Sequence, residues 1–275
     1  MFNRRINNSW QQKIMTEETS IASVYRVTEK ERVKQDDVVV AEFPLTIIFN
    51  NEELATMLCS PSKLKYLAIG FLASEGLIKN KDDIEKVLLN EERGSVRVNT
   101  AKDPVMGSDM VFKRFITSGC GKGTMLYSFA DAMNQEAVDS EMAIPSSRIF
   151  ELMKEFQDRS QIFKNTGGVH SAALADSEGI IIFAEDIGRH NAVDKVFGEC
   201  LWEGISTQDK ILLTSGRVSS EILFKIAKRN VPIMVSRSAP TDLAIRAAND
   251  LGITLIGFVR GKRMNIYTND QRVLK

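Results

Sequence analysis

The chain has 275 residues, and its 36 Lys and Arg balance its 36 Asp and Glu, so the formal net charge is zero. This balance excludes a general electrostatic attraction to nucleic acid or to an acidic membrane surface, so an anionic ligand must be held by a local group of cations. A hydrophobic fraction of 43% and a charged fraction of 26% are typical of a soluble globular protein, and no apolar run approaches the length of a membrane span.

The cysteines also limit the class of protein. The chain has three, Cys59, Cys120 and Cys200, and they lie far apart in the sequence. An odd number of widely spaced cysteines argues against a disulfide framework and favours a reducing compartment. The first residues are polar and lack the apolar stretch of a secretory signal. We therefore expect a cytoplasmic protein.

Predicted strands dominate the first hundred residues. Residues 1–19 are polar and are expected to form a flexible N-terminus. Residues 20–58 contain short β-branched and aromatic runs with Asn50-Asn51 as a turn, which predict a β-meander. Two further short strands are predicted at residues 84–89 and 94–99.

One amphipathic helix is predicted between these strands, over residues 60–76. Ser60-Pro61-Ser62 offers an N-cap and a helix-starting proline, and apolar residues then repeat at helical spacing as far as Gly76. The apolar side of this helix is expected to pack on the meander.

Cys120 stands out because it lies between Gly119 and Gly121, with Lys122 two residues further on. Glycines leave a thiol accessible, and a nearby ammonium favours the thiolate over the thiol. A helix predicted over residues 124–133 would add the partial positive charge of its N-terminus. The alternative is a buried cysteine in a strand-to-helix turn, and this stretch alone does not separate the two interpretations.

In the second half of the chain, predicted strands alternate with predicted helices. Helices are predicted over residues 145–157, 192–201, 219–229 and 241–249, and strands over 169–174, 179–184, 211–214, 231–235 and 253–257. This alternation predicts an α/β sheet covered by helices on both faces, with parallel crossovers in its later half. We place a domain boundary near residue 140, so that residues 20–140 form a smaller α+β domain and residues 141–275 the α/β domain.

Two polar clusters in this half begin with glycine-containing turns. In the stretch of residues 165–170, Gly168 would let backbone amides approach a ligand, and His170 could transfer a proton, although a structural histidine in a glycine turn is the more frequent case. The stretch of residues 185–195 gathers more polar groups than a helix cap requires, which favours a binding site. Its candidate residues are Asp186, Arg189, His190 and Asn191.

Two further clusters predict a phosphate site. Ser215 and Arg217 follow a predicted strand and precede a helix, an arrangement that binds phosphate, although neither the Walker nor the dinucleotide glycine pattern is present. The segment Phe258 to Arg263 carries three cations within four residues, also directly after a predicted strand. At one sheet edge these groups would form a positive pocket for a polyphosphate.

These stretches, in this order, resemble the FdhD family, the accessory sulfurtransferases required for formate dehydrogenase activity. The matching segments run from about residue 20 to Tyr267, and they are Cys59-Ser-Pro, Leu67-Ala-Ile-Gly-Phe-Leu-Ala-Ser-Glu-Gly76, the Cys120 loop, Thr166-Gly-Gly-Val-His170, Asp186-Ile-Gly-Arg-His-Asn-Ala-Val-Asp-Lys195, Ser215-Gly-Arg217, Ser238-Ala-Pro-Thr241 and Gly257-Phe258 with Arg260.

The resemblance implies a function. A cysteine desulfurase loads sulfur onto Cys120 as a persulfide, and the protein, acting as a sulfurtransferase, passes this sulfur to the molybdenum cofactor before the cofactor enters formate dehydrogenase. The cofactor, Mo-bis(molybdopterin guanine dinucleotide), would be a bound substrate with a GDP-like guanine nucleotide moiety. The implied fold is a cytidine-deaminase-like three-layer α/β/α C-terminal domain with a smaller N-terminal domain, paired as a homodimer.

The same resemblance implies which residues bind the cofactor. The family's cofactor-binding segment falls on Phe258, Val259, Arg260, Gly261, Lys262 and Arg263. The residues expected to contact the ligand or to hold its pocket are Gly168, His170, Asp186, Arg189, His190, Asn191, Ser215 and Arg217. We predict no protein-bound metal, no nucleic-acid partner and no membrane partner.

One departure from the family pattern leaves alternatives open. Many members carry a CxxC pair in the loop, whereas the position after Lys122 is Gly123 here. Cys200 falls in an apolar helical stretch and Cys59 at a strand-to-helix junction, so a second thiol is not assigned. A cofactor chaperone without persulfide chemistry is the first alternative, and a general nucleotide-binding module is the second. A zinc deaminase is disfavoured because the chain has no CxxC and no glutamate two residues after His170.

Overall fold

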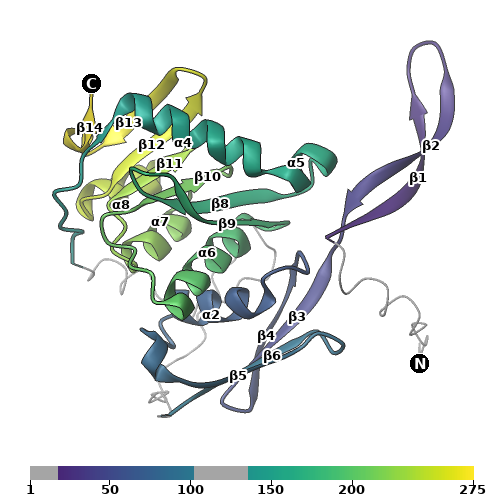
Figure 1. The fold of residues 1–275 in the computed structure, drawn as a ribbon, viewed down its shortest axis with the longest axis horizontal. Helices are drawn as coiled ribbons and strands as arrows, with labels where there is room; N and C mark the ends of the chain where they lie inside the picture. Colours follow the sequence, from purple (N-terminus) through teal and green to yellow (C-terminus); the bar gives the residue numbers. More distant parts are fainter. Residues whose placement is uncertain (1–17, 102–135) are drawn as a thin grey trace.

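The larger sheet of the protein has six strands and gives the fold its α/β class. The computed structural model describes residues 18–101 and 136–275 (Figure 1). In spatial order the strands are β13 (Arg263–Thr268), β12 (Thr254–Arg260), β11 (Ile233–Ser236), β10 (Ile211–Thr214), β8 (His170–Ala175) and β9 (Ile180–Asp186). β10, β11 and β12 are parallel and the other neighbours are antiparallel, which confirms the parallel crossovers predicted for the later half.

Helices cover both faces of this sheet, as the alternation of elements predicted. On one face lie α6 (Arg189–Glu203), α7 (Ser220–Ala227) and α8 (Asp242–Asp250), and on the other lies α4 (Ser146–Arg159) (Figure 1). Successive residues of β10 serve different faces, because Leu212 joins the core under α6 to α8 whereas Leu213 joins the core under α4. Short elements complete this half, namely α5 (Gln161–Thr166), β7 (Ile144–Pro145), η2 (Asp270–Arg272) and β14 (Val273–Leu274).

A second sheet of four strands lies on α2 (Leu64–Ser74). Its strands, in spatial order, are β4 (Glu52–Cys59), β3 (Phe43–Phe49), β6 (Ser95–Thr100) and β5 (Ile84–Asn90), which η1 (Lys81–Asp83) precedes. The predicted meander is wrong at one step, because β3 pairs in parallel with β6 and not with β2. Every second residue of β3 is buried in the core that includes α2, and β3 lies inside the sheet between β4 and β6.

The two remaining strands form a separate ribbon. β1 (Thr19–Val27) and β2 (Arg32–Val40) pair with each other in antiparallel fashion and extend away from the rest of the molecule (Figure 1). At its base, Val40 touches Gly168, where a Cβ would lie only 2.7 Å from the Val40 Cγ1 atom. Gly168 therefore permits a close approach of β2.

Two element ends differ from the sequence prediction. α2 begins at Leu64, after Lys63 in a left-handed conformation with φ 54°, and no side chain caps it. The segment Phe258 to Arg263 does not simply follow a strand, because β12 continues to Arg260 and returns as β13. Phe258 has φ 54° at an irregular position of this pair, and a bulge of this kind has no clear sequence signal.

The halves of the chain meet where α2 crosses α6 (Figure 1). A Cβ on Gly70 would lie 1.8 Å from the backbone oxygen of Asp194, and a Cβ on Gly198 would lie 1.9 Å from that of Tyr66. Only glycine allows the two backbones to approach this closely. Within the described ranges, no helix is both long and apolar enough to cross a membrane. The division near residue 140 stays a prediction.

Candidate functional site

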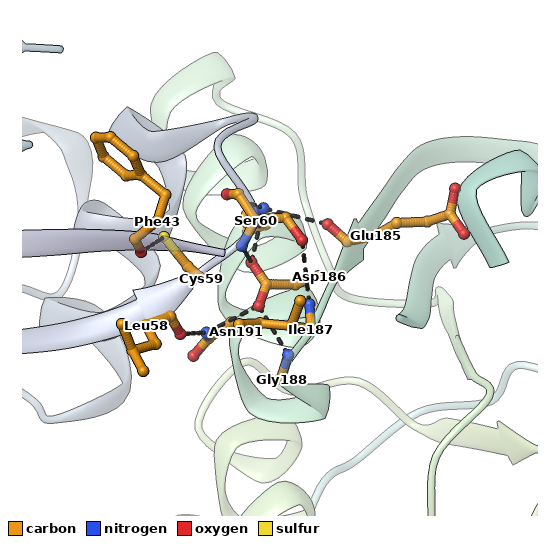
Figure 2. Close-up of polar contacts among 10 residues, drawn as sticks. Phe43, Leu58, Cys59, Ser60, Glu185, Asp186, Ile187, Gly188 and Asn191 are labelled. Carbon is orange, nitrogen blue, oxygen red and sulfur yellow. Dashed lines mark hydrogen bonds and ion pairs between the residues drawn. The ribbon is translucent and has the colours of Figure 1, made fainter. Parts of the chain in front are cut away.

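The junction between β9 and α6 buries an ion pair. Asp186 and Lys195 are both fully buried, and the Lys195 Nζ atom lies 2.8 Å from the Asp186 Oδ2 atom. The second oxygen of Asp186 accepts hydrogen bonds from the Gly188 amide at 2.8 Å and from the Asn191 side-chain amide at 2.9 Å (Figure 2). A buried pair is tolerated only when such bonds satisfy both charges, and here they do.

The same ion pair holds the end of β4. Asp186 Oδ2 accepts a hydrogen bond of 3.0 Å from the Ser60 amide, and Lys195 Nζ donates to the Ser60 carbonyl at 3.2 Å. Asn191 also donates to the Leu58 carbonyl at 2.9 Å, and Ser60 Oγ accepts from the Ile187 amide (Figure 2). We call this group, Leu58, Ser60, Asp186, Asn191 and Lys195, the junction clamp. Asp186 and Asn191, expected to contact ligand or to hold its pocket, bind protein atoms here.

A second group of predicted residues meets where β8 begins and β10 ends. The His170 Nδ1 and Ser215 Oγ atoms lie 3.4 Å apart, and Ser215 Oγ accepts a hydrogen bond from the Ser171 amide at 2.9 Å. A Cβ on Gly216 would lie 3.1 Å from Arg189 Cβ. Burial, and then the positive charge of Arg189, lowers the pKa of His170 below its usual value. His170 is therefore neutral at neutral pH.

Polar atoms without partners lie beside this group. Arg189 Nε and Ser219 Oγ are fully covered and have no hydrogen-bond partner among the described residues, although buried polar atoms normally have one. The His190 Nε2 atom lies 3.0 Å from the Glu221 Oε2 atom. This contact with His190 lowers the pKa of Glu221. The arrangement offers donors that a bound anion could engage.

The loops after the three parallel strands lie side by side. The Arg237 amide donates to the Thr214 carbonyl at 3.1 Å, and the Phe258 amide donates to the Ser238 carbonyl at 3.1 Å. The structure therefore brings the predicted cationic clusters to one sheet edge. The exposed cations there are Arg217, Arg260, Lys262 and Arg263.

Not every residue of the segment Phe258 to Arg263 faces outward. Val259 is fully buried in the core under α4, so its side chain is not offered to a ligand. Phe258 is half-buried, and the Arg260 guanidinium lies 5.8 Å from its ring centroid. Gly261, with φ 57°, allows the turn into β13.

The two thiols that the structure describes are both buried. Cys59 is fully buried, its Sγ donates to the Phe43 carbonyl at 3.4 Å, and burial raises its pKa to about 12 (Figure 2). Cys200 is 2% exposed, and burial likewise raises its pKa to about 12. Neither forms a thiolate readily, so neither fits a second reactive thiol. Cys120, its loop and the helix predicted over residues 124–133 lie outside the described residues.

Comparison with known proteins decides the family. Residues 40–274 match the model of the FdhD/NarQ family. The chain belongs to this family. It is 45% identical over 250 residues to the sulfur carrier protein FdhD of Bacillus pumilus, covering 91% of this chain and 95% of the relative. It is 43% identical over 255 residues to the sulfur carrier protein FdhD of Bacillus subtilis, covering 93% and 97%.

A solved structure of the same kind supports the fold. A crystal structure from Desulfotalea psychrophila, described as a candidate formate dehydrogenase accessory protein, superimposes with a TM-score of 0.78 at 25% identity. The match covers 94% of this chain and 100% of that one.

Sequence reasoning missed several members of the two residue groups described above. Ser60, Lys195, Ser219 and Glu221 all lie in or beside the quoted motifs, but none was expected at a ligand site, and Ser60 was expected only to cap a helix. A lysine within a polar motif gives no sign that it is fully buried, since lysine is ordinarily exposed.

Proposed function

We propose that this protein carries sulfur as a persulfide on Cys120 and delivers it to the molybdenum cofactor of a formate dehydrogenase. The observation that carries the proposal concerns the thiols. Two of the three, Cys59 and Cys200, are buried with a pKa raised to about 12, which leaves Cys120 for sulfur chemistry. The relatives named as sulfur carriers support it.

The loading step is an exchange between a thiolate and a persulfide. The Cys120 thiolate attacks the terminal sulfur of a persulfide on a cysteine desulfurase, a new S–S bond forms, and the old S–S bond breaks. The desulfurase cysteine leaves as a thiolate, the transferred sulfur keeps its hydrogen, and no net oxidation occurs. Lys122 and the flanking glycines favour the attacking thiolate.

The delivery step needs two electrons, because the terminal sulfur of a persulfide is more oxidised than sulfide. We assign these electrons to two thiols of a soluble reductant. One attacks Cys120 and releases sulfide to the cofactor, and the second resolves the resulting mixed disulfide, so that Cys120 returns as a thiol. The resolving thiol must come from outside, since Gly123 replaces the second loop cysteine and the two described thiols are buried.

The cofactor itself is the bound substrate, and the described residues fit its phosphates. Among the described residues, Arg189 Nε at the start of α6 and Ser219 Oγ at the start of α7 have no hydrogen-bond partner, and the exposed Arg217 and Arg260 stand at the same sheet edge. Charged donors and a helix start are suited to a diphosphate. We extend the proposal to binding of the GDP-like moiety and to pairing of two copies in the cytoplasm. We also propose that residues 141–275 form a cytidine-deaminase-like three-layer α/β/α domain.

Mass spectrometry after incubation with a desulfurase and cysteine tests the proposal. Wild type is expected to gain about one sulfur mass on the peptide with Cys120, and Cys120→Ser is expected to gain none. Cys200→Ser serves as the matched control, because its thiol is buried and its removal is expected to leave the adduct unchanged.

Activity in cells completes the test. Cys120→Ser is expected not to restore formate dehydrogenase activity in a strain that lacks this protein. Full activity of Cys120→Ser would overturn the persulfide role. Absence of the adduct with cofactor binding retained would support the chaperone without sulfur chemistry instead, an alternative that Gly123 favours.

A further inference from the structure

Two ammonium groups converge on one indole ring where α2, α6 and η1 meet. The Lys65 Nζ atom lies 3.5 Å from the centroid of the Trp202 ring, and the Lys81 Nζ atom lies 5.1 Å from it. Lys65 belongs to α2, Trp202 to the last turn of α6 and Lys81 to η1, so three elements build this contact. We call Lys65, Lys81 and Trp202 the indole patch.

Neither ammonium group of the indole patch is neutralised by a carboxylate. No ion pair of Lys65 or Lys81 is found among the residues that the structure describes. Burial lowers the pKa of Lys65, the Glu203 carboxylate opposes this shift, and the positive charge of Lys81 adds to it. The two cations therefore repel each other, and a negative charge placed between them would relieve that repulsion.

Two acids close to the indole patch are engaged by other donors. Glu203 Oε1 accepts a hydrogen bond of 2.9 Å from the Tyr66 hydroxyl. Asp83 Oδ2 accepts hydrogen bonds from the Lys79 amide at 2.7 Å and from the Asn80 amide at 3.1 Å. Because these donors hold the two carboxylates, the ammonium groups of the patch stay available to an anion from outside the chain.

A cavity beside the indole patch indicates what kind of anion fits. It has a volume of about 390 Å³, and its lining includes the buried Leu77 and Ile78 together with Asp82 of η1. Lys81 directly precedes Asp82, so the cavity and the patch are neighbours. A small anion would touch only two flexible lysines, whereas a peptide can also place an apolar side chain in the cavity. A protein segment that carries acidic residues and an apolar one therefore fits this surface best.

The indole patch is remote from the cationic sheet edge and adjoins the start of the Cys120 segment. Arg189 begins α6 and Trp202 lies in its last turn, so the helix places roughly 20 Å between them. Ala101 lines the cavity and is the last described residue before residues 102–135, which contain Cys120. A protein bound at the patch is held near the start of this segment and leaves the sheet edge free.

We propose that the indole patch is the docking site for an acidic segment of the protein that loads sulfur onto Cys120. One carboxylate of the segment lies between the Lys65 and Lys81 ammonium groups, and an apolar neighbour enters the cavity. The donor can then reach Cys120 without displacing the phosphates of the cofactor. The identity of the partner as the sulfur donor rests on the proposed function, but the binding of an acidic segment does not.

The fluorescence of Trp202 tests the acidic site directly. The chain has two tryptophans, so Trp10→Phe leaves Trp202 as the only indole. A hexapeptide of five glutamates and one leucine is expected to change this fluorescence in a saturable way, because its carboxylates draw the ammonium groups from the ring. Added to this background, Lys65→Gln and Lys81→Gln are each expected to weaken binding at least fivefold. Asp82→Asn is expected to strengthen it, since a repelling charge is removed.

Lys154→Gln is the matched control, because Lys154 is an exposed lysine of α4, on the other face of the larger sheet. It is expected to bind the peptide as tightly as the parent does. The proposal is overturned if the peptide leaves the fluorescence unchanged, if the Lys65 and Lys81 variants bind as tightly as the parent, or if Lys154→Gln is as defective as they are. Pyrophosphate that binds as tightly as the peptide would also overturn it, since the site would then be one for a small anion.

Sulfur loading tests the identity of the partner. The double variant K65Q/K81Q is expected to raise the KM of the desulfurase for this chain at least fivefold and to reach full loading at saturating concentration. Lys154→Gln is expected to load as wild type does. An unchanged KM in the double variant would overturn the assignment of the donor to this site. Wild type that gains no sulfur would overturn the proposed function and this assignment together, and the acidic site would then be judged by the peptide titration alone.

Discussion

The Asp186 carboxylate and the Lys195 ammonium lie 2.8 Å apart with both side chains fully buried, and together they hold the Ser60 backbone from both sides. The pair therefore fixes the start of α2 against the start of α6.

Removal of one partner of this pair is expected to destabilise the protein strongly. Lys195→Met leaves the Asp186 charge buried without compensation, which costs about 3–5 kcal/mol in the free energy of unfolding. Arg246→Met is the matched control, because its pair with Asp242 is exposed and is worth less than about 1 kcal/mol. Urea unfolding measures both. Equal losses in the two variants would contradict the role of the clamp.

The helix crossing gives a second prediction. Gly198→Ala places a Cβ 1.9 Å from the Tyr66 backbone oxygen, so the helices must separate, and we expect a loss of about 3 kcal/mol or more. Gly204 lies at the end of the same helix, and a Cβ there would meet nothing within 4 Å. Gly204→Ala is therefore expected to destabilise the protein only through its φ of 71°, by about 1 kcal/mol. Thermal unfolding compares the two. A Gly198→Ala variant more stable than wild type would show that helix propensity dominates instead.

The lowered pKa of His170 predicts an acid sensitivity. The unfolded chain binds a proton near the ordinary pKa of 6.5, whereas the folded protein resists protonation, so stability falls as pH decreases through that value. The melting temperature is expected to fall between pH 7.5 and pH 5.5, and His170→Gln is expected to show a smaller fall. An identical pH profile in the variant would rule out this contribution.

Glu221 also makes the folded protein less stable as pH decreases, but it does so at a lower pH than His170. Its folded pKa lies below the ordinary 4.5, so the stability it contributes is complete above that value and is lost as pH decreases below it. In Glu221→Gln, the free energy of unfolding is expected to depend less on pH below pH 4.5 than it does in wild type. Above pH 6 its dependence on pH is expected to be the same as in wild type. Chemical unfolding at fixed pH values provides the measurement.

Nucleotide binding tests the cationic sheet edge. Arg260→Ala and Arg217→Ala are each expected to weaken GDP about tenfold, since a charged hydrogen bond to phosphate is worth roughly 1.5–3 kcal/mol. Arg246→Ala removes an exposed cation of α8 and is expected to bind GDP as wild type does. Calorimetric titration measures all three. If wild type and all three variants bound GDP with equal affinity, the phosphate would not bind at this sheet edge.

The sequence predicted local structure well where one signal decided the outcome. The stripe of Ile149, Leu152, Met153 and Phe156 predicted α4 and is buried there. The helix predicted over residues 241–249 is α8, and the Thr241 hydroxyl caps it by accepting a hydrogen bond from the Ala244 amide. The strands predicted over residues 169–174 and 179–184 are β8 and β9, and the Asp176 side chain accepts hydrogen bonds from the Glu178 and Gly179 amides in the turn between them.

Prediction failed where distant segments compete for the same residue. Ser60 was expected to cap a helix, but its backbone atoms bind Asp186 and Lys195 of the junction clamp, which lie more than a hundred residues away. The parallel pairing of β3 with β6 likewise depends on a segment far along the chain, so local patterns suggested a meander instead. Cys59 could be assigned only when its burial was known.

The junction clamp also bears on how the chain reaches its native state. Ser60 and Asp186 are 126 positions apart, so this contact closes a long loop, and its formation carries a correspondingly large entropy cost. Cys59 is the immediate neighbour of Ser60 and is inaccessible while the contact holds. The rate at which a thiol reagent modifies Cys59 therefore reports the opening of the clamp, and the chain contains its own probe of native-state fluctuations.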